Sequence, residues 1–172
     1  MNKKILNEPV IFVAGILERM ENNTKKILLQ TRWKPETGPL YSGLLEIPGG
    51  SINEYENIFN AIEREVKEEC GLKIIKYRNS FRGELMDVDQ FEKTMIFQPS
   101  ICQQVLNDND GKLWFGFIFI CEVEGQPKIQ KDETKDPKWV SLSELEKLLN
   151  EHREKIFPHQ YQALRYYVEN MK

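Results

Sequence analysis

The sequence predicts an α/β fold in which helices cover both faces of a mixed sheet. Two nearly unbroken apolar runs of strand length, 10–17 and 114–121, lack polar alternation, and strands of that kind are usually covered on both faces. Three segments with helical apolar spacing supply the covering layers. Mixed strands and helices with doubly covered strands together give an α/β sandwich.

Length and charge narrow the class of protein further. The 172 residues fit a single domain spanning 1–172, and 24 Lys+Arg against 27 Asp+Glu give a net charge of -3, which argues against a nucleic-acid partner. No stretch approaches the roughly 18 apolar residues of a membrane span, and no secretion signal is expected. Because Cys70, Cys102 and Cys121 form no C-x-x-C pair, we expect reduced thiols, at least two of them buried, in a cytoplasmic protein.

Two shorter strands are expected at Ile27–Leu29 and Trp139–Val140. The residues Asp108–Gly111 lie between two apolar segments and predict a hairpin turn. A calcium loop is the alternative for this segment, but its twelfth position is Phe117, which offers no acidic ligand. The turn is therefore the preferred interpretation.

Three helices follow from capping residues and spacing. The first is expected from about Glu54 to Cys70, with Gly71 suited to the left-handed position after its end. The second follows Ser141, which forms a capping-box pair with Glu144. The third starts near Pro158. Its apolar stripe predicts core packing and consists of Tyr161, Leu164, Val168 and Met171.

The first helix carries the chemically informative residues. Its buried stripe is Ile58, Ile62 and Val66. Glu65, Glu68 and Glu69 stand at i, i+3 and i+4, so their carboxylates converge on one face, which Lys67 does not share. Such repulsion costs a few tenths of a kcal/mol per pair, so removing Glu65 is expected to leave metal-free stability unchanged or slightly higher. The face is either a solvated acidic surface or a site for a hard cation such as Mg²⁺ or Mn²⁺.

The spacing from Gly50 to Leu72 reads G-x5-E-x7-R-E-U-x-E-E-x-G-U, where U is a bulky apolar residue. Every specified position is met, and the chain therefore resembles the Nudix hydrolases, the MutT-like family. The resemblance extends more loosely over most of the chain. It includes the Leu28–Leu29 strand, the Ile47–Gly50 segment, and Trp139–Leu142 leading into a helix.

The resemblance implies an α/β/α sandwich and hydrolysis of a nucleoside diphosphate linked to another group, with a divalent metal as cofactor. The implied metal ligands are Glu65, Glu68, Glu69 and the carbonyl oxygen of Gly49. Arg64 would hold a carboxylate, Glu65 in the first place, while Glu56 would pair within the motif. Glu133, six residues before Trp139, resembles a further glutamate of the nucleoside-triphosphate branch, with a solvated loop charge as the alternative.

The expected mechanism is attack of a metal-activated water on the pyrophosphate linkage of a nucleoside triphosphate or another nucleoside diphosphate derivative. Glu68 and Glu133 are the candidates for the group that takes the proton of the water. Arg32 and Trp33 either bind phosphate and stack a base, or serve as a strand-end arginine and a packing tryptophan. His152 and His159 are expected at the surface.

The long segment at about 76–112 is expected to be an insertion that acts as a lid or a substrate wall. The partner is a nucleotide-derived small molecule, and a homodimer is possible by analogy with the family. The competing function is a catalytically weak nucleotide-binding or regulatory module.

Overall fold

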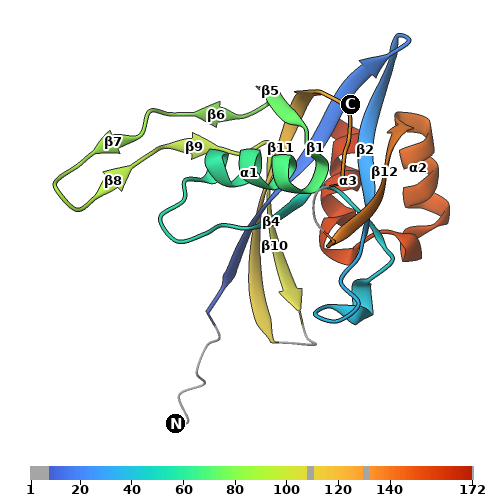
Figure 1. Cartoon of the computed structure of the whole chain (residues 1–172), viewed down its shortest axis with the longest axis horizontal. Coiled ribbons are helices and arrows are strands. Elements are labelled where there is room, and N and C mark those ends of the chain that lie inside the picture. Colours follow the sequence, from blue (N-terminus) through green and yellow to red (C-terminus); the bar gives the residue numbers. More distant parts are fainter. Residues whose placement is uncertain (1–7, 108–110, 130–131, 172) are drawn as a thin grey trace.

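The computed structural model describes residues 8–107, 111–129 and 132–171, and Figure 1 shows how their elements are arranged. The strands are β1 (Val10–Glu21), β2 (Thr24–Arg32), β3 (Leu45–Glu46), β4 (Gly49–Ser51), β5 (Lys73–Arg78), β6 (Phe81–Arg82), β7 (Met86–Asp87), β8 (Lys93–Thr94), β9 (Phe97–Gln98), β10 (Ile101–Asn107), β11 (Lys112–Glu124) and β12 (Thr134–Ser141). The helices are α1 (Ile58–Cys70), α2 (Leu142–Glu151) and α3 (Pro158–Asn170), with short 3-10 turns at Pro39–Tyr41 and Arg153–Lys155.

Eight strands form the main sheet. The order is β10-β11-β1-β2-β12, while β3 pairs with β2, β4 with β1 and β5 with β11. The two long apolar strands β1 and β11 run parallel, from Val10 opposite Trp114 to Glu18 opposite Glu122, and the other pairs are antiparallel. The predicted mixed sheet is confirmed.

Helix α1 covers one face of this sheet, and α2 and α3 cover the other (Figure 1). Alternate residues of β1 divide between two cores, because successive side chains of a strand point to opposite faces. Val13 and Leu17 pack in the core beneath α1, whereas Ala14 and Ile16 pack with α2 and α3. The prediction that the apolar strands are covered on both faces is therefore confirmed.

The start of α1 differs from the expected position near Glu54. Asn57 caps the helix, because its side-chain oxygen accepts from the N–H groups of Phe59 and Asn60 at 3.1 and 3.0 Å. Tyr55 has a φ of 57°, outside the right-handed helical region, so residues 54–56 form a loop. The end is as predicted, with Gly71 at a left-handed φ of 67°.

The other two helices are confirmed. Ser141 and Glu144 form the complete capping box of α2, and Pro158 occupies the first turn of α3. The proposed turn residues 108–110 lie outside the described part of the chain. The strands on either side, β10 and β11, pair antiparallel out to Asn107 and Lys112, as a hairpin requires.

The insertion expected at about 76–112 separates into two parts. Residues 79–99, here called the β-arm, form two small ribbons, β6 with β9 and β7 with β8, that extend from the body beyond α1 (Figure 1). The following strand, β10, forms one edge of the main sheet.

The cysteines match the prediction, since Cys70 and Cys121 are buried, Cys102 is exposed, and all three are free. Among the described residues, no helix combines the length and apolar character needed to cross a bilayer.

Candidate functional site

Two glycines bring a strand against the acidic face of α1. A Cβ atom on Gly50 would lie 2.6 Å from a carboxylate oxygen of Glu65, and one on Gly49 would collide with the backbone carbonyl of Val13. Because any larger side chain would collide in this way, only glycine at these two positions lets β4 pack this closely against β1 and α1. As a result, Glu65 and Glu69 are buried, at 6% and 3% exposure, which contradicts a fully solvated acidic surface.

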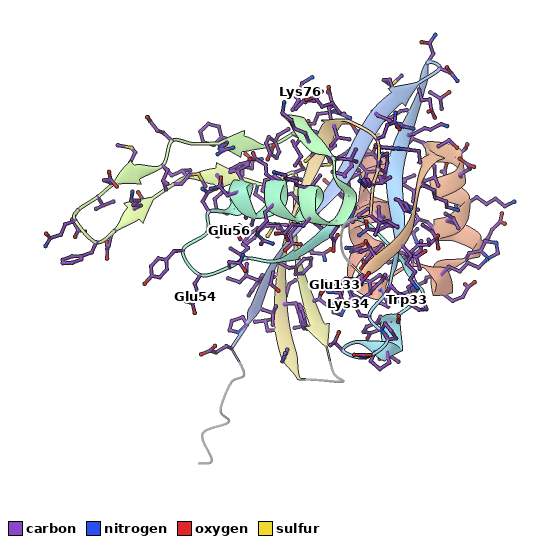
Figure 2. The ribbon with its side chains drawn as sticks, in the orientation of Figure 1. Trp33, Lys34, Glu54, Glu56, Lys76 and Glu133 are labelled. Atoms are coloured by element: carbon purple, nitrogen blue, oxygen red, sulfur yellow. The ribbon has the colours of Figure 1, made fainter. Side chains whose placement is uncertain are left out.

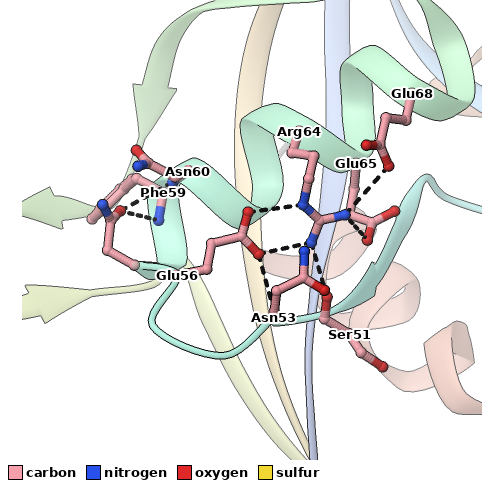
Figure 3. Close-up of polar contacts among 9 residues, drawn as sticks. Ser51, Asn53, Glu56, Phe59, Asn60, Arg64, Glu65 and Glu68 are labelled. Atoms are coloured by element: carbon pink, nitrogen blue, oxygen red, sulfur yellow. Dashed lines mark hydrogen bonds and ion pairs between the residues drawn. The ribbon is translucent and has the colours of Figure 1, made fainter.

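Arg64 neutralises much of the acidic face (Figure 3). Its guanidinium donates to both oxygens of Glu56 at 2.8 Å, to Glu65 at 2.5 Å and to the backbone carbonyl of Ser51 at 3.0 Å, and it pairs with Glu68 at 3.3 Å. The bond to Arg64 holds the pKa of Glu56 below its usual value. The expected contacts of Arg64 with Glu65, and of Glu56 within the motif, are present.

A second acid, Glu46, accompanies Glu69 in the interior. Glu69 accepts from the amide of Gln30 at 2.8 Å and from the backbone N–H of Gly49 at 3.0 Å. Burial, reinforced by the charge of Glu46, raises the pKa of Glu69 to about 8. Burial also raises the pKa of Glu46 to about 7, although Arg32 lies 3.2 Å away.

Sequence reasoning missed Glu46 and Gln30. Each is a polar residue next to an apolar strand segment, and that signal could have identified both. Gln30 directly follows Ile27–Leu29, and Glu46 separates Leu45 from Ile47.

The donor set suits a hard divalent cation, because it consists of carboxylates and a backbone carbonyl. Within the described part of the chain, the hydrogen bonds of Glu69 come from Gln30 and Gly49 and from no cationic side chain, and its raised pKa reflects a buried carboxyl group that a cation would stabilise. Arg64 holds Glu65 and Glu68 in this structure, and within the described residues no three His, Cys, Asp or Glu side chains stand in a metal-binding arrangement. The residues present fit the cation in chemistry and in burial.

A pocket of about 350 Å³ adjoins this acidic cluster. Its lining includes Glu46, Gly49 and Gly50 from the acidic side and the basic residues Arg32 and Lys34. The remaining lining residues are mainly aromatic or polar and are Phe12, Thr37, Tyr41, Ser51, Trp114, Phe157, His159 and Gln160. The pocket therefore has an acidic end and an aromatic end, and the side chains of Arg32 and Lys34 add two positive charges to its wall.

His159 belongs to the aromatic end. It is only 9% exposed, so the expectation of a surface position is wrong. Its ring centroid lies 4.7 Å from that of Phe157, 5.3 Å from Trp114 and 5.8 Å from Tyr41. The first turn of α3 points His159 toward the sheet. His152 is half-buried, its side chain 40% exposed and 3.5 Å from Glu154.

Arg32 and Trp33 separate in the structure. The guanidinium of Arg32 lines the pocket and lies 4.8 Å from the Phe157 ring centroid. Trp33 is not among the lining residues, and its ring lies 3.3 Å from the ammonium group of Lys135. Arg32 is the last residue of β2, whereas Trp33 follows the strand and packs with Lys135 instead.

Glu133 pairs with a residue of the pocket wall rather than with the acidic cluster. Its carboxylate pairs with Lys34 at 2.6 Å, and its backbone carbonyl accepts from the N–H of Trp33 at 2.7 Å. Figure 2 shows these three residues close together. Its side chain is half exposed, and Glu133 is not among the residues that line the pocket, although its partner Lys34 is.

The insertion contributes little to the pocket. None of the described residues 76–107 and 111–112 is among those that line it. The expected lid or wall therefore stays a prediction.

Two known proteins that are similar to this chain in sequence carry names that refer to different substrates. An ADP-ribose pyrophosphatase of Methanocaldococcus jannaschii is 26% identical over 144 residues, covering 84% of this chain and 69% of that protein. An 8-oxo-dGTP diphosphatase of Buchnera aphidicola subsp. Schizaphis graminum is 49% identical over 35 residues, which cover 20% of this chain and only 27% of that protein.

Solved structures share the fold across the whole chain. The NUDIX domain of Shewanella oneidensis NrtR, complexed with ADP ribose, has a TM-score of 0.65 at 14% identity and covers 100% of this chain and 94% of its own. The MutT protein of Methanosarcina mazei Go1 has a TM-score of 0.63 at 23% identity, with coverages of 97% and 99%. The family model described as NUDIX domain matches residues 11–160. The chain therefore belongs to the NUDIX domain family and is a Nudix hydrolase, as the acidic motif predicted.

Proposed function

We propose that the protein hydrolyses the pyrophosphate linkage of a nucleoside triphosphate or another nucleoside diphosphate derivative, with a divalent metal as cofactor. The observation that carries this proposal is the double role of Gly49 and Gly50. They contact Glu69 and Glu65 on one side and line the aromatic pocket on the other. A molecule whose rings occupy the pocket thus has its phosphates beside the carboxylates.

Mg²⁺, with Mn²⁺ as a substitute, is the proposed cofactor. Glu65, Glu68, Glu69 and the carbonyl oxygen of Gly49 would hold it. When bound, such a cation neutralises phosphate charge and acidifies a water molecule. Arg64 positions two of these carboxylates, because it bonds to Glu65 and Glu68 together.

The pocket offers the contacts that a nucleotide needs. Aromatic rings provide faces on which a base can stack, and Arg32 and Lys34 provide positive charge for phosphate oxygens. The indole N–H of Trp114 and the Nε–H of Arg32 are buried and have no hydrogen-bond partner within the described residues. We assign substrate binding to Arg32 and to the aromatic residues of the pocket wall. Trp33 lies outside the pocket, and we assign it packing against Lys135.

Two carboxylates are candidates for the group that takes the proton from the attacking water, Glu68 and Glu133. Glu68 is the most exposed of the three glutamates on the acidic face of α1, Glu65, Glu68 and Glu69, with a side chain 37% exposed, and Arg64 is 3.3 Å from it. Glu133 pairs with Lys34, which lines the pocket. We favour Glu68, because it belongs to the cluster that adjoins Gly50.

The relatives support this class of reaction, since one bears the name of a pyrophosphatase and another that of a diphosphatase. The two names refer to different nucleotides, so we propose only a class of substrate, the nucleotide derivatives. Three free cysteines, two of them buried, support a reducing, cytoplasmic location.

The test is turnover of a panel of nucleoside triphosphates, oxidised nucleotides, sugar nucleotides, CDP-alcohols and ADP-ribose, with Mg²⁺ present. We expect Glu68→Gln to lower kcat by at least about a hundredfold while the fold is kept. Glu63→Gln is the matched control, because Glu63 lies on the same helix and contacts Tyr77 and Arg82 instead of the cluster.

Glu133→Gln, measured in parallel, separates the two candidate bases. Undiminished turnover in Glu68→Gln with a large loss in Glu133→Gln would transfer the role to Glu133. Tight nucleotide binding by the wild type without metal-dependent turnover on any member of the panel would favour the regulatory module.

A further inference from the structure

A second cavity, of about 750 Å³, opens beside the aromatic pocket and is here called the distal pocket. Within the described part of the chain, Ser51 is the one residue that lines both cavities. The other walls of the distal pocket come from the loop between β4 and α1, from the start of β1 and from the start of β11. Its polar lining residues are Glu8, Ser51, Asn53, Glu54 and Lys112.

Ser51 directly follows the two glycines that adjoin the acidic cluster. Gly49 and Gly50 line the aromatic pocket, and the lining of the distal pocket continues along the same backbone over 51–54. A molecule that occupies both cavities therefore passes over Ser51. In the proposed function the phosphates lie beside the two glycines, and the assignment of the distal pocket rests on that placement. The group on the far side of the phosphates then enters the distal pocket.

The loop that lines the distal pocket is fixed by the residues that hold the acidic cluster (Figure 3). Arg64 donates to the backbone carbonyl of Ser51 at 3.0 Å, and Glu56 accepts from the backbone N–H of Asn53 at 3.1 Å. Glu56 and Arg64 are themselves paired at 2.8 Å. These bonds set the backbone of the loop in place before a ligand binds, which lowers the entropic cost of ordering the loop on binding.

The lining of the distal pocket suits an uncharged group that carries several hydroxyls. The carboxylates of Glu8 and Glu54 accept hydrogen bonds, and the amide of Asn53 both donates and accepts them. Hydroxyl groups can satisfy all three side chains, because each hydroxyl is a donor and an acceptor. The apolar lining residues, at 9–11 and at Ile52, offer contacts to the C–H groups of the same molecule.

A terminal phosphate is a poor occupant of the distal pocket. It brings negative charge toward the carboxylates of Glu8 and Glu54, and Lys112 is the single cation among the described lining residues. Repulsion between like charges discriminates against such a group. We propose that the distal pocket binds the group beyond the diphosphate, that this group is an uncharged polyol such as a sugar, and that nucleoside diphosphate sugars are preferred to nucleoside triphosphates.

Equilibrium binding tests the distal pocket without catalysis. Calorimetric titration with a chelator present compares ADP-glucose with ADP, GDP-glucose with GDP and UDP-glucose with UDP. For the base that binds best, the wild type should bind the sugar nucleotide at least about tenfold more tightly than the diphosphate. Asn53→Ala and Glu54→Lys, both at exposed positions, should each remove most of this gain. Glu84→Gln, exposed on the β-arm and outside both cavities, is the control and should keep it.

Turnover with Mg²⁺ gives the second measurement. The ratio of kcat/KM for a nucleoside diphosphate glucose to kcat/KM for the triphosphate of the same base should be at least about ten in the wild type, and Glu54→Lys should lower it about tenfold. Triphosphates hydrolysed as well as the sugar nucleotides would overturn the proposal and leave the proposed function standing.

Equal affinity for the diphosphate and its glucose derivative would overturn the assignment of the distal pocket, and so would an affinity gain that Asn53→Ala and Glu54→Lys both leave intact. A gain that both variants remove, without turnover of any nucleotide, would support the distal pocket and contradict only the proposed hydrolysis. Failure of the two proposals is therefore recognised separately.

Discussion

Replacement of Glu69 by glutamine tests the electrostatics of the site directly. The carboxyl group is 3% exposed, accepts from Gln30 and Gly49, and has a pKa raised to about 8 by burial and by Glu46. Glutamine has nearly the same shape and keeps one oxygen for both donors, but it cannot ionise. Glu69→Gln therefore removes the titration and keeps most of the packing.

The direction in which pH changes the free energy of unfolding follows from the number of protons bound by the folded and the unfolded chain. Between the usual carboxyl pKa of 4.5 and about 8, folded Glu69 keeps a proton that the unfolded chain has released. The folded state then binds more protons, so without metal the free energy of unfolding falls as pH rises through this window. Below pH 4.5 both states are protonated and the penalty disappears. The difference between 4.5 and about 8 corresponds to a loss on the order of 5 kcal/mol for complete ionisation.

The measurement is urea unfolding in the presence of a chelator, from pH 5 to 8.5. We expect the free energy of unfolding of Glu69→Gln to exceed that of the wild type by an amount that grows with pH. Glu146→Gln, on the exposed surface of α2, is the control and should follow the wild type. A wild-type minus Glu69→Gln difference that stays constant from pH 5 to 8.5 would refute the buried-carboxyl reasoning.

Three further predictions use the same structure. Glu65→Ala should lower metal-free stability by about 1–3 kcal/mol in urea unfolding, contrary to the expectation from charge spacing alone, because it removes a charge-assisted hydrogen bond of the Arg64 guanidinium, which then keeps only its bonds to Glu56, Ser51 and Glu68; equal or higher stability would contradict this. Gln160→Ala should cost about 2 kcal/mol, since its amide bonds both the N–H and the carbonyl of buried Ile47, and a loss below about 0.5 kcal/mol would show those bonds to be replaceable. Millimolar Mg²⁺ should raise the thermal midpoint of the wild type, because a ligand at a hundredfold excess over its Kd adds about 2.7 kcal/mol to the free energy of unfolding. An unchanged midpoint would speak against the metal site.

Local signals in the sequence were sufficient for most of the helix ends and for the acidic motif. Ser141, Pro158 and Gly71 mark helix ends through bonds and backbone angles that involve only near neighbours, and the structure has each of them as predicted. The start of α1 was misplaced because Asn57 caps it and Tyr55 adopts a left-handed angle, neither of which apolar spacing reveals.

By itself, the sequence determined the family, the doubly covered sheet and the face shared by the α1 glutamates, because periodicity within one element fixes which side chains share a side. Only the tertiary structure decided what meets that face. Gln30 reaches Glu69 across 39 positions, and His159 enters a pocket with Trp114 because α3 packs on the sheet beside β11. These contacts depend on strand order and layer packing, which no local spacing encodes.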